Sequence, residues 1–324
     1  MNYVISDVHG NYSLLMKLLS KLKVDETKDT VYFCGDFLDR ALSKTEQEEL
    51  IKFYVSNFNN PDSCYKTTIG NHELEFIDGI EGYLRSDIVI DVNFTGEFSA
   101  CRRLVCCKAG IDVSTQNLYL CRSLYRTIVK QPLYYEVVVN DNKYIITHSW
   151  LIDELGNDCT CNPKDAELMN SIYDRGHSIV ELLGGNGNKI IHGHTPTLIK
   201  DCIVRGATIG KVWEKQGNIN VDCGSFLTLF SGGNLGAYCI ETGESVYALT
   251  EQEQCDLIIK IYKSIEGNLY GELSKSDYEY YMEYLNDDLL RKYDLRKLSD
   301  VLPFFQKITY RYMRENKFLL PEYI

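Results

Sequence analysis

Short apolar segments alternate with amphipathic segments along the first part of the chain. Apolar runs of strand length occur at 2–6, 30–34 and 64–69. A helical pattern follows each of them, the first with Leu14, Leu15, Leu18, Leu19 and Leu22 on one face and the others at 43–58 and 73–84. Strands that alternate with helices in this way predict a largely parallel sheet with helices packed on it.

The pattern from 85 to 132 is irregular, and strand patterns return after it. Residues 134–139 and 142–148 flank Asn140-Asp141, a pair typical of a hairpin turn. A helical pattern at 164–183 then leads into an apolar run that ends at His192. The middle of the chain is therefore expected to add a hairpin, a helix and a further strand.

The chain changes character near residue 250. Between 218 and 249, short strand patterns are interrupted by glycines, which predicts a meander at the edge of a second sheet. Beyond Thr250 the sequence is charged and rich in tyrosine, with helical spacing at 252–266 and 275–316. We expect one α/β domain over 1–250 and a helical C-terminal extension over 251–324, whose tyrosines pack a core.

Composition narrows the class of protein. The 324 residues are 44% hydrophobic and 25% charged, as in soluble globular proteins, and they contain no apolar run long enough to span a bilayer and no signal-peptide pattern at Met1. We therefore expect a cytoplasmic location without a membrane partner. The twelve cysteines form no CxxC pair, which favours reduced thiols over a disulfide framework or a structural zinc site. A net charge of −12 argues against general nucleic-acid binding but leaves room for a phosphorylated substrate.

Polar side chains follow the ends of five expected strands. In an α/β sheet these ends form the edge at which ligands bind. The motifs are Asp7-x-His9, Gly35-Asp36-x-x-Asp39-Arg40, Gly70-Asn71-His72-Glu73, His148 and His192-Gly193-His194. Each motif alone is explained by helix capping, a turn or a polar strand end. Together they use five of the six histidines, and this joint pattern predicts a metal centre. The sixth histidine, His177, has no such context.

The donor types favour two divalent cations. The candidate ligands are Asp7, His9, Asp36, Asn71, His148 and His194. Oxygen and imidazole donors without thiolate suit Mn²⁺ best, with Fe, Zn²⁺ and Mg²⁺ as alternatives. Six ligands are too many for one open catalytic ion, but they fit two ions that share a carboxylate, for which Asp36 is the best candidate.

These motifs together resemble those of the phosphoprotein phosphatase family of calcineurin-like metallophosphoesterases, over about 2–249 and in the same order. Pro196 stands where many other metallophosphoesterases have a further histidine, which favours the phosphoprotein phosphatase branch. Within that branch the chain resembles the bacterial and phage serine/threonine phosphatases. The resemblance implies a sandwich of two mixed β-sheets flanked by helices. It also implies a first ion on Asp7, His9 and Asp36, and a second on Asp36, Asn71, His148 and His194. Ala41 and Ser149-Trp150 depart from the usual family residues and leave substrate specificity open.

The expected chemistry is direct hydrolysis of a phosphomonoester. Hydroxide shared by the two ions would attack phosphorus, and no P-loop or Cys-x₅-Arg loop offers another route. His72 follows a proposed ligand and is expected to protonate the leaving oxygen, with Asp39 holding its other N–H; the alternative for Asp39 is a salt bridge to Arg40.

Phosphate binding is expected to fall to arginines. Arg40 belongs to the second motif, and Arg175 follows Tyr173-Asp174 where bacterial relatives carry an aromatic residue and an arginine; a plain surface arginine is the alternative at 175. Asn71 would contact the substrate as well as the second ion.

The expected substrate is a phosphorylated protein at serine or threonine, or a small phosphoester. One alternative is a nucleotide pyrophosphohydrolase of the dinucleoside tetraphosphate or RNA-cap type. The resemblance implies that such symmetrical hydrolases tend to lose the equivalents of Asp39, Arg40 and Glu73, so the presence of these residues here favours the phosphatase. A second alternative is a scaffold without catalysis, which is disfavoured because no ligand is missing.

Overall fold

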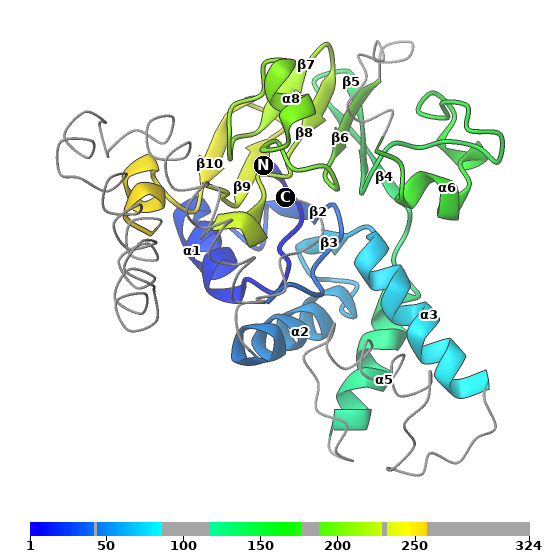
Figure 1. Ribbon diagram of the computed structural model, residues 1–324. Coiled ribbons are helices and arrows are strands. Elements are labelled where there is room, and N and C mark those ends of the chain that lie inside the picture. The colour runs from blue at the N-terminus through cyan, green and yellow to red at the C-terminus, as the bar shows by residue number, and fades with distance from the viewer. Residues whose placement is uncertain (42–43, 86–116, 176–187, 229–231, 258–324) are drawn as a thin grey trace, which may run out of the picture. The chain divides into compact units, whose positions relative to one another are not determined.

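The computed structural model describes residues 1–41, 44–85, 117–175, 188–228 and 232–257 (Figure 1). The chain divides into two compact units. The first comprises Met1–Phe226 and Leu235–Ala248, and the second comprises Leu227–Asn234 and Leu249–Ile324. All the candidate site residues belong to the first unit.

The first sheet contains the strand–helix alternation expected from the sequence. Its elements in chain order are β1 (Asn2–Ile5), α1 (Tyr12–Leu22), β2 (Thr30–Phe33), α2 (Lys44–Phe58), β3 (Tyr65–Thr67) and α3 (Asn71–Arg85). The three strands are parallel, which confirms the prediction. Two later strands, β9 (Gly236–Cys239) and β10 (Ser245–Tyr247), extend the sheet antiparallel on the β1 side.

The second sheet has the order β4-β5-β6-β8-β7. Its strands are β4 (Tyr134–Val139), β5 (Asn142–Thr147), β6 (Lys189–His192), β7 (Trp213–Lys215) and β8 (Asn218–Asn220). The β4–β5 pair is the expected hairpin, and its turn residues Asn140 and Asp141 have φ of 49° and 60°. Asparagine and aspartate tolerate this left-handed region better than most residues, which is why the pair signals a tight hairpin.

Two expectations about individual helices were wrong. Helix α5 (Asn117–Ile128) lies in the stretch expected to be irregular. The single helix expected at 164–183 is replaced, up to residue 175, by η1 (Pro163–Asp165) and α6 (Leu168–Ile172), because Ala166 is extended and Glu167 caps α6 by accepting a hydrogen bond from the Asn170 N–H. Residues 176–187, with His177, lie outside the described residues.

The expected meander at 218–249 is divided between the two sheets. Strand β8 pairs with β6, whereas β9 pairs with β1 in the other sheet. The intervening chain passes through η3 (Ser225–Leu227). Pairing partners of this kind are remote in sequence, so local periodicity could not assign them. A short helix, α8 (Lys200–Val204), precedes β7.

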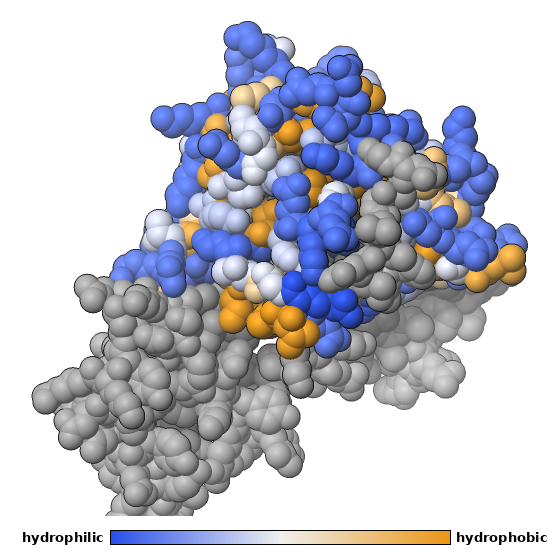
Figure 2. Space-filling model, turned by 90° about the horizontal axis from the view of Figure 1, so that it is seen from above, coloured by the Kyte–Doolittle hydropathy of each residue, from blue (hydrophilic) through white to orange (hydrophobic). Residues whose placement is uncertain are grey.

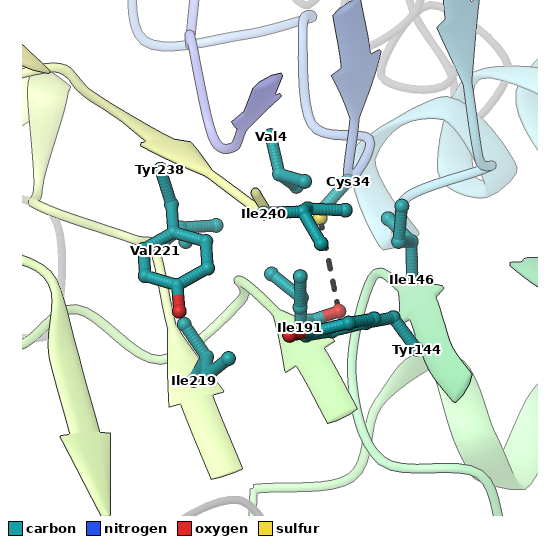
Figure 3. Packing of buried hydrophobic residues seen from close by; sticks show 9 residues of the cluster. All are labelled: Val4, Cys34, Tyr144, Ile146, Ile191, Ile219, Val221, Tyr238 and Ile240. Carbon is teal, nitrogen blue, oxygen red and sulfur yellow. Dashed lines mark hydrogen bonds between the residues drawn. The ribbon is translucent and has the colours of Figure 1, made fainter. Parts of the chain in front are cut away.

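The core between the sheets is apolar on both sides (Figure 3). Val4, Cys34 and Tyr238 of the first sheet or its strand ends meet Ile146 and Ile191 of the second. Because strand side chains alternate in direction, Phe33 lies on the opposite face from Cys34, where its ring contacts Phe53 and Phe58 of α2. The expected α/β sandwich of two mixed sheets flanked by helices is therefore confirmed.

The extension can be described only at its start. Residues 251–257 are helical, and the expected helices beyond 257 lie outside the described residues. None of the described helices is both long and apolar enough to cross a bilayer. The face shown in Figure 2 is mainly hydrophilic, with hydrophobic side chains exposed in scattered groups.

Candidate metal centre

The strand ends bring the predicted motifs to one place. Asp7 lies two residues beyond β1, Asp36 three beyond β2, and His148 directly after β5. Asn71 and His72 begin α3, and His194 lies two residues beyond β6. The two sheets thus contribute to one buried cluster that contains Asp7, His9, Asp36, Asn71, His72, His148 and His194, all of which are less than a tenth exposed.

The donor atoms form two groups that share Asp36. In the first group, His9 Nε2 lies 3.7 Å from Asp7 Oδ1 and 3.8 Å from Asp36 Oδ2. In the second, His148 Nε2 lies 3.6 Å from Asp36 Oδ1 and 3.1 Å from both Asn71 Oδ1 and His194 Nδ1. The two carboxylate oxygens of Asp36 therefore face different groups.

The hydrogen bonds around the second group leave electron pairs facing one another. His148 Nδ1 donates to the Cys34 carbonyl at 2.6 Å, so Nε2 carries the lone pair. Asn71 Nδ2 lies 3.4 Å from Glu75 Oε1, which turns Asn71 Oδ1 toward His148. His148 Nε2 and Asn71 Oδ1 are both hydrogen-bond acceptors. At a separation of 3.1 Å in a buried place they repel each other unless a cation lies between them and accepts both electron pairs. These residues fit a metal ion.

In the first group, too, a histidine lone pair points toward other electron-pair donors. His9 Nδ1 donates to the Leu38 carbonyl at 3.2 Å, which leaves the lone pair of Nε2 facing the carboxylates of Asp7 and Asp36. A carbonyl that accepts from the second ring nitrogen is the usual support of a metal-binding histidine. The donor set of the first group fits a divalent cation as well.

Burial also changes the charge states in the cluster. It lowers the pKa of His9 and His194 well below the usual range and that of His148 to about 3, so these rings are neutral at neutral pH. Burial raises the pKa of Asp7 and Asp36 far above the usual range, with further increases from Asp222 on Asp7 and from Asp7 on Asp36. Neutral imidazoles and crowded carboxylates are the arrangement that a divalent cation relieves.

The backbone of the centre is strained at the same residues. Among the described non-glycine residues with φ in the left-handed region are Asp7, His9, Asp36, Asp39, Arg40 and His194. Strain of this kind persists where the surrounding structure enforces it and tends to cluster at functional sites.

Two glycines permit the close approach of strand ends. A Cβ atom at Gly70 would overlap Asp36, and one at Gly193 would overlap Ser6 and Asp7. The glycine before Asn71 and the glycine before His194 are therefore required by packing against the ligands themselves.

Glu73 has a structural role that the sequence did not reveal. Its buried carboxylate accepts the backbone N–H groups of Asp36, Phe37, Leu38 and Gly70 at 2.7 to 3.1 Å. These bonds fix the turn that carries Asp36 and join it to the start of α3. The fourth residue of the Gly70-Asn71-His72-Glu73 motif thus supports the ligands without facing them.

Replacing Glu73 by glutamine should lower the free energy of unfolding by about 2–4 kcal/mol, because an amide places its own N–H groups against some of these four donors. Urea denaturation would measure the change. Glu26→Gln is a matched control, since Glu26 is exposed and should change stability by less than about 0.5 kcal/mol. Equal midpoints for the Glu73 variant and the wild type would contradict this role.

His72 and Asp39 form the expected pair. His72 Nδ1 lies 3.1 Å from Asp39 Oδ2, and the other ring nitrogen lies 3.8 Å from Asp36 Oδ2. Asp39 Oδ1 accepts the Arg40 backbone N–H at 2.8 Å. Asp39 thus contacts Arg40 through the backbone, and the alternative of a side-chain salt bridge between them is not what the described residues show.

The two arginines lie in different surroundings. Arg40 Nη1 is 3.3 Å from His9 Nε2, next to the first group. Arg175 is exposed, and its charge contributes to the lowered pKa of His148 and His194, which places it near the second group. Each group of metal donors therefore has one arginine nearby.

Several residues near the centre were not singled out from the sequence. The Ser6 hydroxyl and the His194 N–H, the latter at 3.0 Å, both donate to Asp7 Oδ2. Asp222 is buried near Asp7 with a pKa of about 6, raised by burial. Asp222 follows the end of β8, so the expectation that polar residues after strand ends line the site would also have identified Asp222.

His192, the last residue of β6, is not one of the donors. Its ring contacts the Gly193 carbonyl at 3.0 Å and Asn218 Oδ1 at 2.7 Å, and it belongs to neither donor group.

Similarities to known proteins agree with this geometry. A family model described as calcineurin-like phosphoesterase matches residues 3–198. The serine/threonine-protein phosphatase 2 of Salmonella typhimurium is 23% identical over 240 residues, which cover 74% of this chain and 92% of that protein. The symmetrical bis(5'-nucleosyl)-tetraphosphatase of Actinobacillus succinogenes is 32% identical over 75 residues, 23% of this chain and 25% of that protein.

The match to the tetraphosphatases is partial, since the chain spans about a quarter of their length. A solved protein serine/threonine phosphatase from Saccharomyces cerevisiae shares 17% identity, with a TM-score of 0.43 over 77% of this chain and 80% of that one. The family model, in contrast, covers well over half of the 324 residues. The chain therefore belongs to the calcineurin-like phosphoesterase family.

Proposed function

We propose that this protein is a phosphatase that depends on two divalent cations and acts on phosphoserine and phosphothreonine in proteins. The observation that carries the proposal is the orientation of Asp36, whose two oxygens face two separate groups of donors. A single carboxylate between two such groups is what a pair of ions requires as a bridge.

The first ion would be held by Asp7, His9 and Asp36, and the second by Asp36, Asn71, His148 and His194. Mn²⁺ is the expected metal for both, because the donors are carboxylate, carboxamide and imidazole. Two bound cations would supply an acidified water for in-line attack and would polarise the phosphoryl oxygens.

His72 competes with Asp7 for a place in the first group, since its ring also lies close to His9 and Asp36. We assign His72 to proton transfer because Asp39 holds Nδ1 and leaves Nε2 facing the centre. Asp7, in contrast, is fixed by Ser6 and His194 with Oδ1 turned toward His9. His72 would then hold the proton at Nε2 and deliver it to the departing oxygen of serine or threonine.

The arginines would bind the phosphoryl group from two sides. Arg40 lies at the first donor group and Arg175 near the second, and guanidinium groups match phosphate oxygens in a bidentate way. Asn71 would add a contact to the substrate beside the second ion. The positive charges of the two arginines also explain how an acidic protein could attract a phosphorylated partner locally.

Two observations support the protein phosphatase over the nucleotide hydrolase. The match to the Salmonella phosphatase runs over most of both chains, whereas the tetraphosphatase matches are confined to about a quarter of each. In addition, Asp39, Arg40 and Glu73 all make the contacts described above, so the residues that favour a phosphatase are built into the centre. For these reasons we propose that the protein belongs among the bacterial and phage type phosphatases.

A substrate panel tests the proposal. The Mn²⁺-loaded protein would be assayed on phosphoserine, phosphothreonine and phosphotyrosine peptides, on an aryl phosphate and on diadenosine tetraphosphate. We expect phosphate release from the serine and threonine peptides that stops when the metal is chelated. A preference for diadenosine tetraphosphate by orders of magnitude would overturn the choice of substrate, and no turnover of any of them would support a scaffold.

We also propose that the protein works in the cytoplasm. Eight cysteines whose side chains the structure describes are free thiols, and six of them, including Cys34 and Cys223, are buried, as is usual for reduced thiols in a reducing compartment.

A further inference from the structure

Phe226 contacts the centre although no motif pointed to it. It lies in η3, after the loop that follows β8, and is partly exposed. The centre of its ring is 4.2 Å from Arg40 Cζ, within the range of a cation–π contact. The same ring forms a T-shaped contact with the ring of His9, with ring centroids 5.0 Å apart and planes at 82°.

The side chain of Arg40 depends on these contacts. Its guanidinium reaches Nη1 to within 3.3 Å of His9 Nε2, and among the described residues it forms no ion pair with a carboxylate. An arginine that is free to rotate loses considerable conformational freedom when it binds a phosphate. A ring that already holds the guanidinium in place removes part of this loss before the ligand arrives.

The backbone at Arg40 adds to this constraint. Asp39 and Arg40 have φ of 71° and 60°, and the Arg40 N–H is bound to Asp39 Oδ1. The strained turn sets the direction in which the Arg40 side chain leaves the backbone, and Phe226 meets it from a remote part of the chain. The turn alone fixes only the start of a long side chain, so the ring is needed to place its end.

We propose that Phe226 is a positioning residue that holds the Arg40 guanidinium beside the first donor group, ready to bind a phosphoryl oxygen. The inference rests on the proposed function, since it assumes that Arg40 binds phosphate. Arg40 covers one face of the ring, so the ring acts on the phosphoryl group through Arg40 and not as a platform for the rest of the substrate.

A double-mutant cycle tests this role. The variants are Phe226→Leu, Arg40→Ala, the combination of both, and Phe226→Tyr, which keeps the ring. For each Mn²⁺-loaded protein we would measure kcat and KM on an aryl phosphate, the Kd of inorganic phosphate by calorimetry, and the metal content. Phe53→Leu is a matched control, because Phe53 is a partly buried ring packed on Phe33 and Phe58 away from the donors.

Phe226→Leu is expected to raise KM and the phosphate Kd roughly 3- to 30-fold, with a smaller change in kcat and no loss of metal. Phe226→Tyr and Phe53→Leu should stay close to the wild type. In the Arg40→Ala background, Phe226→Leu should have no further effect, because the partner through which it acts is gone.

Three results would overturn the inference. The effects of Phe226→Leu and Arg40→Ala could add in full, which would show that the ring contacts the substrate directly. Phe226→Leu could lose metal, which would show that it acts through His9. Phosphate binding could weaken in Arg40→Ala while Phe226→Leu matches the wild type, so that the proposed function stands without this inference. If the wild type neither binds inorganic phosphate nor hydrolyses any phosphoester, the proposed function itself fails.

Discussion

Replacing Asp36 by asparagine should remove both cations at once and abolish most of the activity. The amide cannot offer two charged oxygens to the two groups that Asp36 now faces. Loss of metal-assisted stabilisation of the transition state is worth several kcal/mol, so kcat/KM should fall by on the order of 10³-fold or more. Metal analysis after Mn²⁺ loading and dialysis should find the bound metal reduced from two ions per chain toward none.

The stability of the metal-free variant distinguishes this effect from unfolding. Burial and the neighbouring Asp7 raise the pKa of Asp36, so a neutral amide relieves repulsion in the metal-free protein. Its carbonyl oxygen can still accept the His72 N–H, which lies 3.0 Å from Asp36 Oδ1. The Tm without metal should therefore not fall, and Asp141→Asn at the exposed hairpin turn should leave metal content and activity unchanged. A variant that keeps both ions would contradict the bridging role.

Replacing His72 by asparagine should lower kcat on phosphopeptides by roughly 10²–10⁴-fold while the metal content stays at the wild-type value. The variant removes the ring whose Nε2 faces the centre but no proposed ligand. The loss should be smaller on an aryl phosphate with an acidic leaving group, because such a group departs without a proton. Steady-state kinetics on the two substrates, with metal analysis of the same sample, would measure both effects.

This variant also separates the two assignments of His72. If the metal content drops, His72 is a ligand of the first ion, in the group that it forms with His9 and Asp36. If kcat is unchanged on phosphopeptides, His72 takes no part in the reaction.

Local pattern predicted the parts of the fold that depend on neighbouring residues. The first three strands and helices carry their own periodicity, and Asn140-Asp141 carries the turn geometry, so both were found from the sequence. Helix α5 was missed, and the chain from 218 to 249 was assigned to one sheet although β8 and β9 lie in different ones. Pairing of β9 with β1 joins residues from opposite ends of the first unit, and no local signal specifies it.

In the candidate site, too, the sequence predicted the residues that follow local patterns and missed the contacts between remote residues. The sequence predicted a site at the ends of strands, and the structure brings the candidate residues together: Asp7, His9, Asp36, Asn71, His72, His148 and His194. The contacts that hold them were not foreseen. The Glu73 carboxylate accepts hydrogen bonds from the backbone of a turn that is remote in sequence. Phe226 contacts Arg40 although the two residues are also far apart along the chain. Such contacts depend on the three-dimensional arrangement, and a residue's type alone does not reveal them.

The central claim is that Asp36 joins two metal ions in one centre, and anomalous scattering from crystals of the Mn²⁺-loaded protein tests it most directly. We predict two peaks, one beside Asp36 Oδ2 near Asp7 and His9, and one beside Asp36 Oδ1 near Asn71, His148 and His194. A single peak, or a first peak coordinated by His72 in place of Asp7, would contradict the account.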